Sequence, residues 1–193
     1  MIYCGDVSEC LEQIPTASVQ TCIAHPPYWQ GHEDGDLGGE PRFVDYLSKL
    51  VLIYQEVHRT LTDTGDLWLV VDTLDIAPLL KTSGWYHAQS CTNEQDYILH
   101  FYQQPRPVQL MNALWTFSLY DESTITHLQY YQPLPHGLVS QCIQHSTDVG
   151  DTVLDLFSGT GTTSIAAQHL ARQYVAIDCD PIACAMLEER LRR

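Results

Sequence analysis

Basic side chains are scarce in this chain. Nine Lys and Arg residues stand against 24 Asp and Glu, which gives a formal net charge of −15, and only Lys49 and Lys81 are lysines. Proteins that bind nucleic-acid phosphates usually carry the opposite sign. Arg190, Arg192 and Arg193 form the nearest thing to a basic cluster, although they equally suit the negative end of a helix. A nucleic acid would therefore be held weakly by this chain alone, unless a partner subunit, a dimer groove or a high-salt cell interior compensates.

Other absences exclude whole classes of protein. No apolar stretch approaches the roughly 20 residues that span a bilayer, and the first residues lack the basic-then-apolar layout of a secretory signal. Seven cysteines are odd in number and form no Cys-x-x-Cys pair, which argues against a disulfide framework and against a structural zinc site. We expect a cytoplasmic protein with reduced thiols, no metal and no membrane contact.

Length and hydrophobic periodicity predict an α/β fold. With 193 residues, 45% of them hydrophobic, the chain can form one compact domain over 1–193. Strands alternate with helices, which indicates a doubly wound, mostly parallel sheet, and a hairpin-like pair near 96–119 adds an antiparallel edge. We expect strands at 1–4, 19–24, 67–71, 96–102, 114–119, 153–156 and 174–177, helices at 7–14, 42–61, 138–143, 163–170 and 181–193, and a turn at 62–66.

Two segments follow predicted strand ends, where ligands bind in open α/β sheets. The first is Ala24-His25-Pro26-Pro27-Tyr28-Trp29, and the second runs from Asp155 to Thr163 with the letters DLFSGTGTT. Gly159 and Gly161 permit a tight turn and a close ligand approach, and the next helix offers its N-terminus to an anion. The second segment thus indicates a nucleotide-type pocket. Because Ser164 replaces the third glycine of a dinucleotide fingerprint, an NAD-type oxidoreductase is an outside alternative.

Together the two segments resemble the DNA amino-methyltransferases that modify cytosine N4 or adenine N6. The catalytic motif precedes the glycine loop, as in the circularly permuted, beta-class-like members. The resemblance covers nearly the whole chain, since the segments YCGD (3–6), LGGE (37–40), GDLWL (65–69), QPLPHGL (132–138) and GDTVLD (150–155) also look like parts of that family. It implies a circularly permuted, Rossmann-like methyltransferase fold that uses S-adenosyl-L-methionine. No separate target-recognition domain is evident, because the region 81–131 is too short for one.

The resemblance also implies which residues hold the cofactor. Asp178, at the end of the strand after the glycine loop, would accept the ribose hydroxyl hydrogens, and Asp6 would accept from the adenine amino group. A plainer alternative makes Asp6 the N-cap of the first helix and Asp178 or Asp180 a cap of the last one. The amino-acid half of the cofactor would be cradled by Phe157, Ser158, Gly159, Gly161 and Thr162.

The catalytic loop must direct the lone pair of an exocyclic amine, which is otherwise delocalised into the base. In the family, an Asp, Asn or Ser and the carbonyl of the first proline accept the N–H hydrogens, so His25 and the Pro26 carbonyl take these roles here. Pro27 helps to hold that carbonyl rigid. Tyr28 would stack on the extruded base, with Trp29 beside it in contact with the nucleic acid.

His25 departs from the common patterns of the family. A neutral imidazole can accept a hydrogen bond and an imidazolium can only donate, so we predict that activity falls as pH drops through the pKa of His25. The alternative is a histidine that merely packs beside the Pro-Pro turn of an inactive site. Trp29 and the Gly38–Glu40 spacing look more like family members with serine at this position, which favours cytosine N4 over adenine N6.

Substrate and partners stay open at this point. The predicted partner is DNA, single-stranded or duplex with a flipped base, and a homodimer or a partner subunit is possible. The same chemistry on RNA, a protein or a small amine is an alternative, as is a non-catalytic subunit of a methyltransferase complex. Aromatic residues between 81 and 131 either stack on bases or pack in the sheet and a subunit interface: Trp85, Tyr86, Trp115, Tyr120, Tyr130 and Tyr131.

Overall fold

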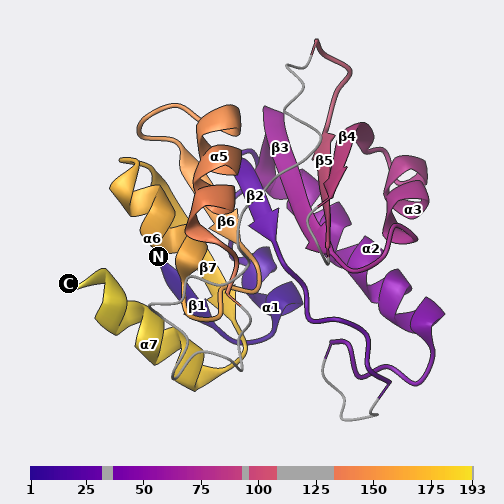
Figure 1. Ribbon diagram of the computed structural model, residues 1–193, viewed down its shortest axis with the longest axis horizontal. Coiled ribbons are helices and arrows are strands. Elements are labelled where there is room, and N and C mark those ends of the chain that lie inside the picture. Colours follow the sequence, from indigo (N-terminus) through magenta and orange to yellow (C-terminus); the bar gives the residue numbers. More distant parts are fainter. Residues whose placement is uncertain (32–36, 93–95, 108–132, 193) are drawn as a thin grey trace.

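A seven-stranded sheet organises the chain, in the order β1-β7-β6-β2-β3-β5-β4 (Figure 1). The computed structural model describes residues 1–31, 37–92, 96–107 and 133–192. All neighbouring pairs are parallel except β3–β5 and β4–β5, which confirms the predicted mostly parallel sheet with an antiparallel edge. The strands are β1 Ile2–Cys4, β2 Val19–Ala24, β3 Leu61–Val71, β4 Tyr86–Thr92, β5 Tyr97–Tyr102, β6 Thr152–Asp155 and β7 Gln173–Asp178.

Helices cover both faces of this sheet, as the doubly wound prediction requires (Figure 1). They are α1 Val7–Glu12, α2 Phe43–Thr60, α3 Ile76–Thr82, α5 His136–Ser146, α6 Thr162–His169 and α7 Pro181–Leu191. Successive strand residues point to opposite faces, so each central strand feeds two cores. Cys22, Leu67 and Leu154 pack with α1, α2 and α3, whereas Ile23, Trp68 and Val153 pack with α5 and α6.

The first and last strands of the chain are neighbours in the sheet. Strand β1 pairs in parallel with β7, and the Met1 ammonium donates to the Tyr174 carbonyl at 2.8 Å. This confirms the expectation that the last strand lies beside the strand that begins at Met1. New and old chain ends at such a position are compatible with a circular permutation, which stays a prediction.

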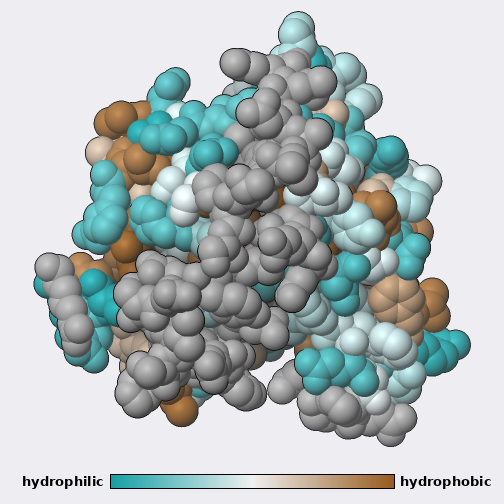
Figure 2. All heavy atoms as spheres, viewed as in Figure 1, coloured by the Kyte–Doolittle hydropathy of each residue, from teal (hydrophilic) through white to brown (hydrophobic). Residues whose placement is uncertain are grey.

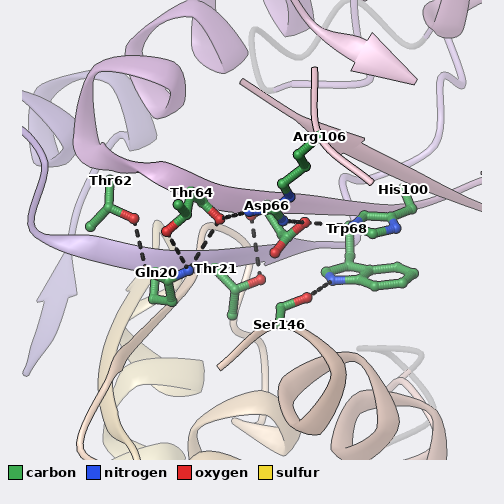
Figure 3. A network of polar contacts seen from close by, with 9 residues as sticks. All are labelled: Gln20, Thr21, Thr62, Thr64, Asp66, Trp68, His100, Arg106 and Ser146. Carbon is green, nitrogen blue, oxygen red and sulfur yellow. Dashed lines mark hydrogen bonds and ion pairs between the residues drawn. The ribbon is translucent and has the colours of Figure 1, made fainter. Parts of the chain in front are cut away.

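The region between α2 and β3 differs from the predicted turn at 62–66. Strand β3 begins directly at Leu61, and residues 62–65 form an irregularity, because Val19 pairs with Leu61 while Thr21 pairs with Asp66. The side chain of Gln20 spans this irregularity: its amide accepts from Thr62 and donates to the Thr64 carbonyl (Figure 3). The local sequence Thr-Asp-Thr-Gly-Asp at 62–66 is typical of a turn. The contacts of the Gln20 side chain from the neighbouring strand therefore hold this segment in a strand.

The antiparallel edge also differs in its composition. Helix α3 and strand β4 are present without having been predicted, and β4 is the strand that pairs with β5 at the edge. The predicted strand at 114–119 lies outside the described residues, as do Trp115, Tyr120, Tyr130 and Tyr131. Trp85 is buried and Tyr86 stacks on Tyr102 across the hairpin, so these two aromatics pack within the sheet region.

A buried polar network links β3, β5 and α5 (Figure 3). The Asp66 carboxylate, 2% exposed, contacts His100 Nε2 at 2.6 Å and Arg106 at 2.6 Å. His100 stacks on Trp68 with ring centroids 3.8 Å apart, and the Trp68 indole donates to Ser146 Oγ at 2.7 Å. One carboxylate thus fastens the segment after β5 to the middle of β3, next to the helix α5.

The thiols, the possible metal ligands and the surface can be described for residues 1–31, 37–92, 96–107 and 133–192. All seven cysteines are free. Within the described ranges, no group of three or more His, Cys, Asp or Glu residues could hold a metal ion, and no helix is long and apolar enough to cross a membrane. On the face in Figure 2, the described surface is largely hydrophilic with small apolar patches.

Candidate active site

The two sequence segments lie side by side at the carboxyl ends of two neighbouring central strands. Strands β2 and β6 are parallel neighbours in which Ile23 pairs with Asp155. His25 and Phe157 each follow two residues later, so both loops leave the same edge on strands about 4.8 Å apart. The predicted catalytic loop and the predicted glycine loop are therefore adjacent, as the strand-end argument requires.

A chain of hydrogen bonds runs through the catalytic loop. The Tyr28 hydroxyl donates to the Asp96 carboxylate at 2.5 Å, and His25 Nε2 lies 3.0 Å from the same hydroxyl oxygen. The His25 and Tyr28 rings meet edge to face at 5.4 Å. Burial lowers the pKa of His25, against which Asp96 raises it, and burial together with Asp96 raises the pKa of Tyr28. His25 is thus neutral and Tyr28 protonated at neutral pH.

The two proline carbonyls of this loop differ in their partners. The Tyr46 hydroxyl, from α2, donates to the Pro27 carbonyl at 2.9 Å. The Pro26 carbonyl makes no hydrogen bond to any residue of the described ranges, and neither does His25 Nδ1. Both predicted acceptors of the substrate amine are therefore free of hydrogen bonds to the described residues.

The segment Leu37–Glu40 holds the catalytic loop from its other side. Gln30 N donates to the Gly38 carbonyl at 2.7 Å, and the Trp29 indole donates to the Glu40 carbonyl at 2.8 Å. The Glu40 side chain is buried, accepts from Gly38 N and pairs with Lys49 at 2.7 Å. A Cβ at Gly38 would lie 2.7 Å from the Tyr28 carbonyl oxygen, so only glycine permits this close contact.

The glycine loop is held by backbone bonds and leaves several buried hydroxyls unpaired. Ser158 N donates to the Ile177 carbonyl at 3.0 Å, and Gly161 N donates to the Ser158 carbonyl at 2.7 Å. Gly161 has φ +88°, and a Cβ there would overlap the Leu187 side chain of α7. Within the described part of the chain, the buried hydroxyls of Ser158, Thr160 and Ser164 have no hydrogen-bond partner. Such orphaned groups are typical of a site that a ligand completes.

The acidic residues around this loop have defined partners. Asp178 ends β7 and accepts from Gly159 N at 2.6 Å and Asp180 N at 2.9 Å, so it braces the glycine loop. Asp6 follows β1, which pairs with β7, and it caps α1 by accepting from the backbone N–H groups of residues 8 and 9. Asp180 caps α7. Asp6 and Asp180 therefore cap helices, as the plainer alternative has it, while Asp178 caps no helix and faces the loop; the cofactor role of Asp6 stays a prediction.

Asp155, at the end of β6, has an unusual ionisation. Complete burial raises its pKa to about 7, although Thr163 and the Phe157 N–H stabilise its charged form. Its carboxyl is thus part protonated near neutral pH, beneath the glycine loop.

Sequence reasoning missed Asp96 as a part of the site. The sequence marks it only as the first residue of a strand, and it lies 68 positions from Tyr28 in the chain. No local pattern distinguishes it, since a single acid before an apolar strand is ordinary. Only the pairing of β3 with β5 brings it to the catalytic loop.

Known proteins share this architecture and part of this sequence. The model of a family described as DNA methylase matches residues 81–189, which include the glycine loop and Asp178 and begin after the His25 segment. The type II methyltransferase M.XycI of Xanthomonas campestris pv. cyanopsidis is 24% identical over 261 aligned residues, covering 99% of this chain and 87% of that protein. Because this chain has 193 residues, that relative carries segments without a counterpart here.

Two solved structures are similar over almost the whole chain. A DNA modification methylase of Thermus thermophilus, complexed with S-adenosyl-L-methionine, is 25% identical with a TM-score of 0.78, and the match covers 100% of this chain and 94% of that one. The cytosine-N4-specific PvuII DNA methyltransferase is 17% identical with a TM-score of 0.77, covering 98% and 85%. The sheet order and helix layers described above are thus those of a known fold.

Proposed function

This chain belongs to the N6/N4 family of DNA methylases, and from that membership we propose which reaction it catalyses. The catalytic loop with His25 and Pro26 would position the exocyclic amine of a DNA base for methylation, cytosine N4 in preference to adenine N6. The chain is a site-specific DNA methyltransferase that uses S-adenosyl-L-methionine. The observation that carries the proposal is the position of two free acceptors, His25 Nδ1 and the Pro26 carbonyl, beside the glycine loop.

The catalytic loop acts by orienting the amine. His25 Nδ1 and the Pro26 carbonyl each accept one N–H of the base amine, which localises on the nitrogen the lone pair that is otherwise delocalised into the ring. S-adenosylmethionine, held by the glycine loop, would supply an electrophilic methyl group on its sulfonium sulfur; the amine nitrogen would take that methyl as the S–C bond breaks and would lose one proton to water. Tyr28 offers its ring face to the extruded base, while Pro27 and Tyr46 keep the loop in place. Trp29, 38% exposed beside this loop, is the second proposed contact to the nucleic acid.

The residues around the glycine loop fit the cofactor. The N-terminus of α6 presents unpaired N–H groups to a carboxylate, starting at Thr162, and the loop before it supplies the unpaired hydroxyl of Ser158. Asp178 and Asp6 lie at the ends of paired strands, where carboxylate oxygens can reach an adenosine moiety. We assign the cofactor site to Asp6, Phe157, Ser158, Gly159, Gly161, Thr162 and Asp178.

Few basic side chains are free to bind DNA phosphates, which favours a second subunit in DNA binding. Among the described residues, Lys81 is the one Lys or Arg without an ion pair or hydrogen bond to the protein. Five of the others form ion pairs, and Arg172 and Arg190 donate to backbone carbonyls. Few cations are left for phosphates, so a second copy or a partner subunit would supply them. We propose that the chain works as one cytoplasmic methyltransferase domain within a restriction-modification system.

Product analysis tests the proposal. Purified protein is incubated with isotopically labelled S-adenosylmethionine and with duplex DNA, single-stranded DNA or RNA, and the nucleosides are identified by mass spectrometry. We expect labelled 4-methylcytosine from DNA. Labelled 6-methyladenine would reverse the base preference, label in RNA alone would reverse the substrate, and tight cofactor binding with no product would indicate a non-catalytic subunit. A melting temperature raised by NAD and unaffected by S-adenosylmethionine would contradict the cofactor assignment.

A further inference from the structure

Asp96 is placed to control the proton arrangement of the catalytic loop. It precedes β5, is 8% exposed, and accepts the Tyr28 hydroxyl hydrogen at 2.5 Å. Among the described residues, the groups that face Tyr28 and His25 come from three other parts of the chain: Asp96 before β5, Asp72 after β3 and Tyr46 on α2. Of these, only Asp96 is hydrogen-bonded to Tyr28.

Counting protons along this chain fixes the histidine tautomer. A carboxylate can only accept, so the single hydroxyl proton of Tyr28 points to Asp96. The Tyr28 oxygen must then accept from its other neighbour, which makes His25 Nε2 the protonated nitrogen. In a neutral imidazole the remaining nitrogen, Nδ1, carries a lone pair and no proton. Nδ1 is the free acceptor that the proposed function requires.

We infer that Asp96 is a positioning residue, which acts through Tyr28 to hold His25 in the tautomer that can accept from the substrate amine. This inference rests on the proposed role of His25. Without Asp96, the Tyr28 hydroxyl is free to donate to His25 Nε2, and the ring proton moves to Nδ1. Two N–H donors would then face each other, His25 Nδ1–H and the substrate amine, and productive binding would be lost.

A double-mutant cycle tests whether Asp96 acts through Tyr28. We expect Asp96→Ala to lower kcat by about 10- to 100-fold with little change in the KM for S-adenosylmethionine. In a Tyr28→Phe background, which removes the connecting hydroxyl, the same substitution should lower kcat by less than about 3-fold. Equal losses in both backgrounds would mean that Asp96 is merely structural, and no loss in the first would overturn the inference. Thermal melting of every variant shows whether it is folded.

Two further measurements separate this inference from the proposed function. Nitrogen-15 NMR of the His25 imidazole should report Nε2–H in the wild type and a shift toward Nδ1–H in Asp96→Ala, whether or not the protein methylates DNA. An Nδ1–H tautomer in the wild type would contradict the inference directly. Asp96→Asn keeps an acceptor and removes the charge that raises the pKa of His25, so the acid limb of its activity profile should move to lower pH. An unmoved acid limb would show that the Asp96 charge does not act on His25 and would count against the inference.

Discussion

Among single residues, His25 in its proposed role would set the pH range in which the site can work. Burial lowers the pKa of His25 below its ordinary 6.5, and the nearby Asp96 only partly opposes this. Above that pKa the imidazole is neutral and Nδ1 accepts, whereas below it the imidazolium only donates. We therefore expect the site to be active on the alkaline side of the transition.

Activity of the wild type should fall as the pH drops through a midpoint below 6.5. The matched control is His25→Asn, whose amide oxygen accepts without titrating, so its profile should stay flat between about pH 5 and 8. Initial rates of methyl transfer across that range, with saturating cofactor, make the comparison. The same acid limb in both proteins would assign the transition to another group.

Substitutions at Gly161 and Gly150 can distinguish the cost of backbone strain from the cost of side-chain crowding. Both have positive φ, +88° and +92°, but a Cβ at Gly161 would overlap Leu187 while a Cβ at Gly150 meets nothing within 4 Å. Gly150→Ala should cost about 1 kcal/mol in the free energy of unfolding, and Gly161→Ala about 1–3 kcal/mol more. Chemical denaturation measures both, and calorimetry should find weaker cofactor binding in Gly161→Ala alone. Equal costs would mean that α7 does not crowd the glycine loop.

The site is predictable from the sequence to the extent that it depends on consecutive residues. His25, Pro26 and the glycine loop follow buried strands, so their place at one sheet edge can be inferred from the strand pattern alone. The contacts of Asp6 could not be decided, because a helix cap and a ligand acceptor look alike in sequence. Asp96 and Tyr46 reach the loop from distant elements, through pairings that single-sequence patterns do not encode.

At the scale of strands and helices, the polar network around Asp66 joins β3 to β5 and to the segment after β5 (Figure 3). Asp66→Ala would leave the His100 and Arg106 groups without their shared acceptor. We expect a loss of about 3–5 kcal/mol in the free energy of unfolding, because removing one member of a buried pair leaves its partners without a hydrogen-bond acceptor. Glu188→Ala, which breaks the exposed pair with Arg192 on α7, should change it by less than about 1 kcal/mol. Equal effects in urea denaturation would contradict the fastening role.

The central elements were predictable and the edge was not. Strands β2 and β6 and the second half of β3, from Leu67 to Val71, are largely buried and apolar, which gives them a clear signal in the sequence. Strand β4 consists largely of exposed or half-buried residues from Tyr86 to Thr92, so it lacks one. The prediction of a turn at 62–66 was wrong for a different reason. Gln20 on the neighbouring strand makes hydrogen bonds to Thr62 and Thr64, in place of the bonds within a local turn.

For the molecule as a whole, the charge distribution predicts unusually salt-insensitive DNA binding. Each phosphate contact adds about −0.9 to the slope of log K against log salt concentration. With Lys81 as the unpaired basic side chain of the described ranges, we expect a slope shallower than about −2 for this chain alone. Fluorescence anisotropy with labelled DNA from about 50 to 500 mM salt measures it. A slope steeper than about −5 would show that the chain holds phosphates by itself.

The central claim is that His25 accepts from the substrate amine while the glycine loop holds the methyl donor. Single-turnover transfer from labelled S-adenosylmethionine to DNA tests it most directly, with the wild type, His25→Ala and His25→Asn compared at equal cofactor occupancy. The account predicts a methylated base in the wild type, a loss of on the order of 100-fold in His25→Ala, and retained transfer in His25→Asn. Undiminished transfer by His25→Ala would contradict it.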